Sequence, residues 1–527
     1  LPSNTGMAFI YVQHLSPHSE SKLTEILSKK TKMKVQEIHD MDEIRPDNLH
    51  VIPADKGIEV AEGHIKLIPR SLSSRSVSID ILFKSLARTH KERVIGIILS
   101  GSANDGTLGA EAIKSEGGLT FAQDESAKFG SMPKSAIAED VIDFVMSPKE
   151  IAQELGRLSK HPFVSSESDT VDIQRLKNHE VSRDHPDLKA IFRKLHQVID
   201  VDFSSYKLKT MLRRIYRRML VHQLSTLKEY ADLLHRESTE VNMLYQDLLI
   251  NVTSFFRETE ANEYLKEVLL PKIISKKSDG DALRIWVPAC ATGEEAYSIA
   301  MVILEILKNN KAEFPVQIFA TDLSKKAIEK ARIGVYSKNE LEIVSPERLN
   351  RFFSKTDGSY RIKKSVRSMC VFAQHNILLD PPFSHIDLIS CCNLFIYLDT
   401  AAQKKAVGVF HYALKQSGYL MIGKSESISH SANLFEHFDK NQKVYLPKKD
   451  SGHQRLPSVS PNLSRHLLPK ENDFSSPGSG VPQNKLTVDH KGLEKAIDSL
   501  LISEYLPASV VINHRMEIVQ FRGDTNL

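Results

Sequence analysis

One stretch of the chain, residues 284–297, constrains the fold more than any other. An apolar run at 285–287 is followed by a turn of small residues at 289–293 and by an apolar-periodic segment at 296–307. This order predicts a strand, a tight loop and a helix, the opening unit of a nucleotide-binding α/β domain. Small residues let the loop backbone approach a ligand, and the helix N-terminus presents free N–H groups. Only Gly293 is a glycine, so we expect a smaller, non-anionic group there rather than a pyrophosphate.

An acidic residue follows at the distance expected for such a domain. Residues 316–320 form the next predicted strand, and Asp322 stands just past its end, where a carboxylate can accept hydrogen bonds from two ribose hydroxyls. An equally compatible interpretation is that Asp322 caps the next helix, at 323–333. Further strands are predicted at 369–373, 386–391 and 419–422. The alternation of strands and helices predicts a doubly wound α/β domain.

Three short motifs in this part of the chain match a known family. They are Asn251-Val-Thr-Ser-Phe-Phe-Arg257, Glu294-Glu295 and Cys392-Asn393-Leu394-Phe395-Ile396-Tyr397. With them, residues 185–447 resemble the chemotaxis receptor methyltransferases of the CheR type. These enzymes are protein-glutamate O-methyltransferases that use S-adenosylmethionine. The resemblance therefore implies this cofactor, and it implies the glutamate side chains of chemoreceptors as the substrate.

The resemblance also assigns roles to individual residues. Arg257 is implied to hold a carboxylate of the substrate or the cofactor, and Tyr397 to orient the methyl group. Neither needs to move a proton, because a glutamate carboxylate is already ionised near neutral pH. The residues implied around the cofactor are Asn251, Thr253, Arg257, Glu295, Asp322, Asn376, Ile377, Cys392 and Asn393. Cys392 departs from the family pattern, which usually has arginine there, so cofactor affinity or substrate handling is expected to differ if that side chain matters.

Residues 185–258 are predicted to form a small helical domain with a basic helix. Leu208, Leu212, Ile215 and Met219 fall on one apolar face of that helix. The basic residues beside them are Lys209, Arg213, Arg214, Arg217 and Arg218. A charge run of this kind is usually only a solvated face. The resemblance implies instead a docking surface for the acidic, helical cytoplasmic region of a chemoreceptor, where opposite charges would speed encounter and orient the substrate.

The first part of the chain, residues 1–158, carries a different pattern. A strand-like run at 6–13 ends at His14, and a second run at 93–100 leads into a glycine-flanked loop that carries Asp105. A His and an Asp that follow strands suit a hydrolase triad, although a loop His and an Asp in an ordinary turn are the simpler interpretation. Several motifs of this part resemble those of the CheB-type receptor methylesterases: Val12-Gln-His14, Ser76-Val-Ser-Ile-Asp80-Ile-Leu-Phe83, Asn104-Asp105-Gly106, Ala122-Gln-Asp-Glu-Ser126 and Gly130-Ser-Met-Pro133. That resemblance implies a parallel-sheet esterase domain with His14 as general base and Asp105 as its orienting partner.

In that family the nucleophilic serine lies on a strand-turn-helix loop well before the histidine. The resemblance implies that this loop would fall upstream of Leu1 here. Ser3 follows no strand, and Ser102 lacks the sharp Gly-x-Ser-x-Gly elbow. We therefore expect that this chain, as given, does not hydrolyse receptor methyl esters.

The sequence predicts an α/β multidomain protein with six segments. They are a methylesterase-like domain at 1–158, a linker at 159–184, the helical domain at 185–258, the methyltransferase domain at 259–449, a flexible linker at 450–489 and the start of a PAS-like α+β domain at 490–527. Within the last segment, residues 493–501 are helix-like, and residues 509–513 and 517–521 are strand-like. A short hairpin packed on the linker is the alternative to a PAS domain.

Residues 333–367 form an insertion with little apolar alternation. In relatives of the CheR type this insertion includes a small antiparallel sheet that can bind a receptor tail peptide. Residues 353–360 look short for such a sheet, so we expect docking that does not use a tail.

Several function classes are disfavoured. A net charge of only +4 does not indicate a nucleic-acid protein. The motif Asp380-Pro-Pro-Phe383 resembles one in DNA methyltransferases, but it precedes the strand at 386–391 where theirs follows it. Four cysteines without ligand or disulfide spacing indicate no metal and a reducing, cytoplasmic compartment. No apolar run is long enough to insert into a membrane.

A non-catalytic chemosensory scaffold is the main alternative function. In that interpretation both catalytic units are relics, and the chain acts by binding receptors. Components of the chemosensory kinase and response-regulator pathway are further candidate partners under either interpretation. Measurable affinity for the cofactor separates the two.

Overall fold

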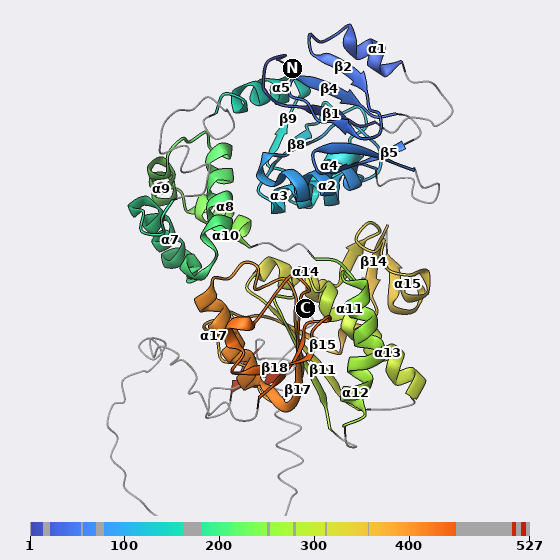
Figure 1. Ribbon diagram of the computed structural model, residues 1–527, viewed down its shortest axis with the longest axis vertical. Helices are drawn as coiled ribbons and strands as arrows, with labels where there is room; N and C mark the ends of the chain where they lie inside the picture. Colours follow the sequence, from blue (N-terminus) through green and yellow to red (C-terminus); the bar gives the residue numbers. More distant parts are fainter. Residues whose placement is uncertain are drawn as a thin grey trace, which may run out of the picture. The chain divides into compact units, whose positions relative to one another are not determined.

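The computed structural model describes residues 2–13, 22–53, 56–69, 78–161, 181–249, 253–277, 281–310, 314–356, 358–448, 509–512 and 518–522. The chain divides into two compact units, Leu1–Val252 and Thr253–Leu527 (Figure 1). Within the described ranges, no helix has both the length and the apolar character needed to cross a membrane. The expected strand before Asp105 and the strand that leads to His14 are present but shorter than expected, and His14 itself lies outside the described residues.

The first unit begins with three small sheets. Their strands are β1 (Phe9–Tyr11), β4 (Asn48–Val51) and β2 (Lys34–Glu37) in one parallel sheet, β7 (Ile95–Ile98), β8 (Leu119–Gln123) and β9 (Phe144–Met146) in a second parallel sheet, and β3 (Asp42–Glu43), β6 (His64–Pro69) and β5 (Lys56–Ala61) in an antiparallel one. Parallel strands need crossover connections, and helices supply them. The helical segments of this part are α1 (Leu23–Ser28), α2 (Ser78–His90), η1 (Lys91–Arg93), α3 (Thr107–Ser115), α4 (Ser131–Ala138) and α5 (Pro148–Leu158).

Strand β7 packs on both of its faces, as its apolar composition predicts. Ile98 belongs to one buried cluster, whereas Ile95 and Ile97 pack against a second cluster built around Phe121. A strand covered on both faces is typical of parallel sheets in α/β proteins.

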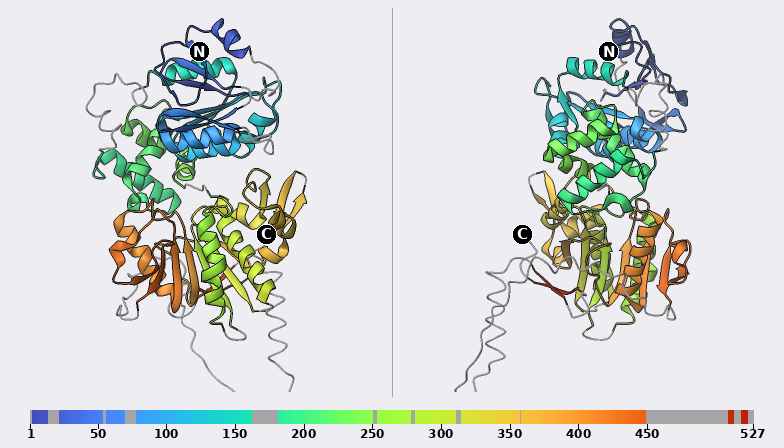
Figure 2. Two further views of the ribbon diagram at one scale, coloured as in Figure 1. Left: turned by 45° about the vertical axis from the view of Figure 1, so that its right-hand side comes forward. Right: turned by 90° about the vertical axis from the view of Figure 1, so that its left-hand side faces the viewer.

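Among the described residues, four helices follow in the same unit, and Figure 2 shows them as one green group. They are α7 (Pro186–Ile199), α8 (Leu208–Val221), α9 (Leu227–Arg236) and α10 (Ser238–Leu248), with a short η2 turn (Phe203–Ser205) before α8. Thr226 and Glu229 start α9 as a reciprocal capping box. Leu212, Ile215 and Met219 of α8 are fully buried, which confirms the predicted apolar face of that helix.

The second unit is built on a seven-stranded sheet of order β15-β11-β10-β16-β17-β19-β18. Its strands are β10 (Leu283–Pro288), β11 (Val316–Asp322), β15 (Cys370–Gln374), β16 (Ile386–Cys391), β17 (Leu414–Ile422), β18 (Phe435–Asp439) and β19 (Val444–Pro447). Pairings from β15 through β17 are parallel, and β18 and β19 add antiparallel edge strands. The chain builds outward from β10 first through β11 and then through β16, which makes the β10–β16 boundary the point where strand order reverses.

Helices connect these strands, and in Figure 1 α13 and α17 lie apart with the strands between them. The helical segments are α11 (Thr259–Tyr264), the π-helical turn η3 (Leu265–Leu269), α12 (Leu270–Ile274), α13 (Glu294–Asn310), α14 (Lys325–Ile333), α15 (Pro346–Phe352), α16 (Lys364–Arg367), α17 (Thr400–Ala413) and η4 (Ser429–Ser431). The strand predicted at 386–391 is found with the same bounds. The other predicted strands differ by a few residues at their ends.

The expectation that residues 353–360 are too short for a sheet is wrong. Strands β12 (Val335–Ser337), β13 (Phe353–Thr356) and β14 (Ser359–Ile362) form a small antiparallel sheet in the order β12-β14-β13. Gly358 has a φ of 85° in the tight turn between β13 and β14, a conformation that glycine adopts easily.

Near the end of the chain, β20 (Ser509–Ile512) and β21 (Ile518–Arg522) pair as an antiparallel hairpin. The two predicted strands are therefore present within about one residue of their expected bounds. The predicted helix at 493–501 lies outside the described residues.

Candidate active site

The carboxyl ends of four parallel strands meet at one edge of the large sheet. Pro288 at the end of β10 pairs with Thr321, and Asp322 at the end of β11 pairs with Gln374. Strand β16, on the other side of β10, ends at Cys391. In open α/β sheets, ligands bind at this edge, in the crevice where strand order reverses.

The loop between β10 and α13 has an unusual backbone. Ala289 and Ala291 have φ values of 55° and 46°, in the left-handed region that costs energy for residues with a Cβ. The loop is held by hydrogen bonds from the Cys290 N–H to the Thr321 carbonyl (3.0 Å) and from the Ala291 N–H to Asp322 Oδ2 (2.9 Å). Neighbouring strands therefore impose this shape.

Gly293 is required for packing as well as for its φ of 97°. A Cβ at this position would lie 2.9 Å from Cβ of Ala331 and 3.1 Å from Cε1 of Phe372. From the sequence, we expected the small residues to let the loop backbone approach a ligand closely. For Gly293, the structure gives another reason: the start of α13 packs closely against Ala331 and Phe372.

Asp322 braces the turn after β11. Its Oδ1 accepts from the Ser324 N–H (2.8 Å) and its Oδ2 from the Ala291 N–H. The N-cap of α14 is Ser324, whose hydroxyl accepts from the Ala327 N–H (3.2 Å), so the interpretation of Asp322 as the helix cap is wrong. Burial raises the pKa of Asp322. Each carboxylate oxygen has two acceptor positions, so the group can still accept hydrogen bonds from a ligand.

Two further carboxylates lie where α13 begins. Glu294 is buried and accepts from the Thr292 hydroxyl (2.8 Å), whereas Glu295 accepts from the Ser390 hydroxyl (2.5 Å) at the end of β16. Desolvation raises the pKa of both groups to about 7. The charge of Glu426 raises the pKa of Glu295 further. A site that holds several desolvated carboxylates favours a cationic ligand over an anionic one.

Cys392 is the residue for which the resemblance implies a departure from the usual arginine. Its thiol makes a hydrogen bond with Glu295, which opposes the rise in the pKa of that carboxyl. Burial raises the pKa of the Cys392 thiol well above its usual range. Cys392 therefore faces the site as a neutral group, without the positive charge of an arginine.

A glutamate that sequence reasoning missed organises the loop after β16. Glu426 Oε2 accepts from the N–H groups of Asn393 and Gly423 (both 2.9 Å), and its Oε1 accepts from the Ile396 N–H (3.3 Å). Asn393 has a φ of 62°. A Cβ on Gly423 would lie 2.9 Å from Glu426 Oε2. The available sequence signal was a glycine directly after β17, three residues before an acidic side chain.

The remaining predicted residues of this site are less closely gathered. Thr253 is partly buried and Arg257 is exposed just before α11, whereas Asn251 lies outside the described residues. The Tyr397 N–H donates to the Leu394 carbonyl (3.1 Å) in a turn of the loop that Glu426 holds.

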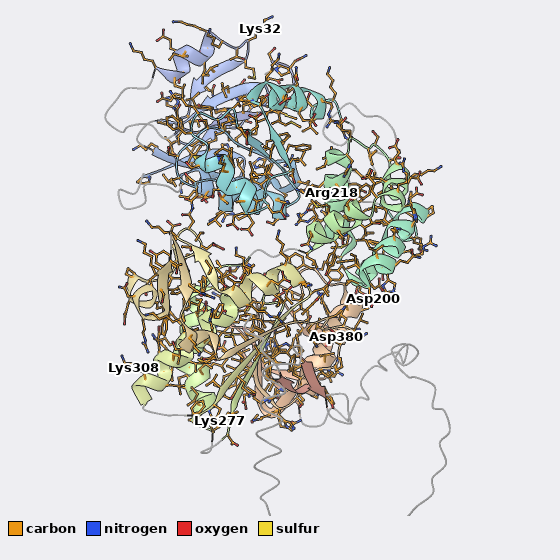
Figure 3. The ribbon with its side chains drawn as sticks, turned by 180° about the vertical axis from the view of Figure 1, so that it is seen from behind. Lys32, Asp200, Arg218, Lys277, Lys308 and Asp380 are labelled. Carbon is orange, nitrogen blue, oxygen red and sulfur yellow. The ribbon has the colours of Figure 1, made fainter. Side chains whose placement is uncertain are left out.

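Asn376 and Ile377 lie in a turn after β15, at the same sheet edge. The Asn376 N–H donates to Asp380 Oδ2 (2.7 Å), and its side-chain oxygen accepts from the Leu378 N–H (3.0 Å). Asp380, labelled in Figure 3, is thus a turn-forming residue. Phe383 is fully buried, with its ring centroid 4.9 Å from that of Trp286. The motif that resembles DNA methyltransferases has these structural roles.

The predicted docking arginines are not an exposed face. Arg217 has a fully buried side chain paired with Asp143 and Asp247, and the side chain of Arg218 pairs with Glu240. Arg214 is buried, and only about a sixth of the Arg213 side chain is exposed. Lys209 is exposed, as expected. The expectation of a solvated basic face is therefore wrong for the arginines, because carboxylates distant in sequence fold over them.

Asp105 in the first unit is fully buried at the start of α2. Its two oxygens accept from the N–H groups of Ile79 (3.1 Å) and Asp80 (3.0 Å). Asp80 accepts from the Gly109 N–H (2.6 Å), and burial together with the charge of Asp105 raises the pKa of Asp80 to about 7. Asp105 is therefore placed to fix this helix start. Its expected relation to His14 falls outside the described residues.

Three family models match the chain. They are "CheR methyltransferase, SAM binding domain" at residues 251–444, "CheR methyltransferase, all-alpha domain" at 186–249 and "CheB methylesterase" at 1–155. The chain is 30% identical over 256 residues to the chemotaxis protein methyltransferase of Borreliella burgdorferi, a match that covers 47% of this chain and 90% of that relative. The chain belongs to the CheR family of chemotaxis methyltransferases. The methylesterase match shows that a CheB-type domain precedes its CheR domains.

Two other proteins are similar to this CheR-family chain. It is 34% identical over 423 residues to an uncharacterized 104.1 kDa protein of Rhodobacter capsulatus, which covers 77% of this chain. The chain spans only 44% of the length of that relative. The crystal structure of the Thermotoga maritima CheB methylesterase catalytic domain is 29% identical and covers 30% of this chain and 87% of that one, with a TM-score of 0.28.

Proposed function

We propose that this chain transfers the methyl group of S-adenosylmethionine to glutamate side chains of chemoreceptors. The observation that carries the proposal is the pair of acidic side chains, Glu295 and Asp322, on either side of the strained loop between β10 and α13. Asp322 ends β11, and Glu295 lies in the first turn of the helix that follows the adjacent parallel strand β10, at the sheet edge where such folds bind nucleosides.

The residues present suit this cofactor. Asp322 is placed to accept hydrogen bonds from ribose hydroxyls, since its oxygens retain free acceptor positions. Glu295 is placed to bind a cationic group, because its desolvated carboxylate has a raised pKa and an acidic neighbour that a cation would relieve. Thr253, Asn376, Ile377, Cys392 and Asn393 are proposed as further contacts of the cofactor, as is Asn251, which lies outside the described residues.

The protein's share of the reaction is positioning. The cofactor supplies an activated methyl group, and the receptor glutamate is already ionised near neutral pH. Arg257 is proposed to bind and orient the incoming carboxylate, a role that suits its planar guanidinium group. Tyr397 is proposed to orient the reacting groups from the loop that Glu426 holds. What remains is to hold the reacting atoms in line and to exclude water.

We propose that receptors approach through α8, using Lys209 and the arginines Arg213, Arg214 and Arg217. The acidic helices of a receptor cytoplasmic region complement this charge. The burial of Arg218 against Glu240 supports a structural role for that residue instead. We also propose that the chain combines this methyltransferase with its CheB-type domain, and that the hairpin of β20 and β21 begins a PAS-like module. The proposed location is the cytoplasm, and the proposed further partners belong to the chemosensory kinase pathway. Because Ser102 is not on a nucleophile elbow, we propose that this chain does not itself hydrolyse methyl esters.

The decisive experiment is transfer of labelled methyl from S-adenosylmethionine to a purified receptor cytoplasmic fragment. The wild-type chain is compared with Asp322→Ala and with Glu329→Ala, an exposed residue on α14. We expect base-labile label on the fragment with wild type and Glu329→Ala, and none with Asp322→Ala. Absence of label together with undetectable cofactor binding by the wild type refutes the proposal. Cofactor binding without transfer to any receptor supports the scaffold alternative.

A further inference from the structure

The basic face of α8 is covered by the CheB-type domain within the first unit. The Arg217 guanidinium donates to the Gly118 carbonyl (2.9 Å) and pairs with Asp143. Arg214 donates to the Lys114 carbonyl, and Arg213 pairs with Glu116 (3.2 Å). Lys114 belongs to α3, Glu116 and Gly118 to the loop between α3 and β8, and Asp143 directly precedes β9. Each of the three arginines proposed for docking therefore has a partner in the CheB-type domain, and Arg217 pairs in addition with Asp247 of its own helical domain.

The covering contact also has an apolar part. Leu220 and Val221, at the end of α8, pack against the buried cluster that contains Leu119 and Leu155 of the CheB-type domain. An ordered arrangement of the two domains follows, because apolar burial and directional ion pairs act at the same face.

The fit around Arg214 is incomplete. Arg214 is only 2% exposed, yet its Nε and Nη2 have no hydrogen-bond partner among the described residues. Desolvation and the charge of Arg213 lower the pKa of Arg214 to about 9. A buried cation with unsatisfied donors destabilises the closed arrangement relative to one in which an acidic partner satisfies them.

The basic residue of α8 that points into its own domain behaves differently. Arg218, labelled in Figure 3, donates from Nε to Glu240 Oε1 (2.9 Å), and Tyr230 donates to the same oxygen (2.7 Å). This network lies wholly within the helical domain. Separation of the CheB-type domain would uncover Arg213, Arg214 and Arg217 and leave Arg218 in place.

We propose that the CheB-type domain acts as an internal competitor of the receptor, occupying the basic face of α8 until an acidic receptor helix displaces it. The inference rests on the proposed methyltransferase function. The two occupants offer the same chemistry, carboxylates and carbonyl oxygens, to the same three guanidinium groups, so they cannot bind together. Methyl transfer is therefore held back by this contact and released when the two domains separate.

The contact can be weakened without touching α8. Asp143→Asn retains an oxygen for the Thr120 N–H, which donates to Asp143 Oδ2 (2.9 Å), but removes the charge that faces Arg217. Glu116→Lys places a like charge opposite Arg213. The double variant Glu116→Lys/Asp143→Asn is compared with Glu125→Lys, which repeats the glutamate-to-lysine substitution at an exposed position of the same domain.

The opposite perturbation locks the contact. An ideal Cβ on Gly117 would lie 2.7 Å from Cγ of Arg213, so the Cβ atoms of Gly117→Cys/Arg213→Cys fall within roughly the 3.5–4.5 Å that a disulfide spans. The oxidised and reduced forms of this one variant are compared, which cancels the loss of Arg213 and the strain at position 117. Wild type treated with the same oxidant controls for the native cysteines, of which Cys392 is the most accessible.

The readouts are the affinity for a receptor cytoplasmic fragment, measured without cofactor, and the initial rate of methyl transfer at low receptor concentration. We expect the double variant to bind the fragment about tenfold more tightly and to lower its KM, with unchanged kcat and cofactor affinity. Glu125→Lys should behave as wild type, and oxidation of the cysteine pair should abolish fragment binding reversibly. Unchanged fragment affinity in the double variant, or full binding by the oxidised pair, overturns the inference. Loss of methyl transfer in every form, with these binding differences intact, refutes only the proposed function.

Discussion

Replacement of Glu426 by Gln tests how the loop that carries Asn393 and Tyr397 is held. A glutamine has the shape of the native side chain but only one acceptor oxygen. If that oxygen takes the place of Oε2, the bonds from Asn393 and Gly423 persist as neutral ones and the amide group faces the Ile396 N–H. The loss of one bond and the weakening of two charge-assisted bonds should cost about 2–3 kcal/mol.

This cost should appear chiefly in catalysis, because the affected N–H groups belong to the loop beside the proposed reaction centre. At about 1.4 kcal/mol per factor of ten, we expect kcat/KM for a receptor fragment to fall roughly 30- to 140-fold. Circular dichroism and thermal unfolding report whether the fold survives. Glu436→Gln on β18, an exposed position, is the matched control and should leave both quantities unchanged. A Glu426→Gln enzyme within twofold of wild type would show that the carboxylate does not position this loop.

Three other predictions concern the same unit. The pKa of Glu295 is raised to about 7, so its carboxylate is protonated below that pH and binds a cationic cofactor less well. Cofactor affinity, measured by calorimetry, should therefore rise between pH 6 and pH 8. A flat profile in the wild type, or the same slope in Glu295→Gln, would contradict this prediction. The pKa of Glu294 is likewise raised above its ordinary value of 4.5, to about 7, so its contribution to stability is present at low pH and is lost as pH rises through about 7. Denaturant unfolding without cofactor should show that Glu294→Gln removes this loss, which is on the order of 3 kcal/mol. Equal pH dependence in both proteins would refute this prediction. Phe383→Ala removes a fully buried ring packed on Trp286 and should lower the free energy of unfolding by about 3–5 kcal/mol. Phe129→Ala, at an exposed position, should change the free energy of unfolding little. A small loss of stability in Phe383→Ala would mean that the surrounding side chains collapse to fill the space.

Local patterns in the sequence were enough to predict the methyltransferase framework. The strand at Ile386–Cys391 is continuous and apolar because both of its faces are covered, and such runs are visible without any knowledge of the partners. The number of residues between β10 and Asp322 is set by the length of one strand-helix-strand unit, so the position of this acidic residue in the sequence could be predicted. These features are set by residues that are close in sequence.

The contacts that control the site come from residues far apart in the chain. Glu426 reaches the Asn393 N–H across 33 residues, and Arg217 meets Asp143 across 74 and Asp247 across 30. Periodicity correctly placed the arginines on one side of a helix, but it could not say that carboxylates from another domain would cover them. The sequence by itself determined which segments become strands and helices, because local spacing of apolar side chains decides that. Which charges are buried, paired or left without a partner was decided only by the tertiary structure, because pairing depends on which distant segments pack together.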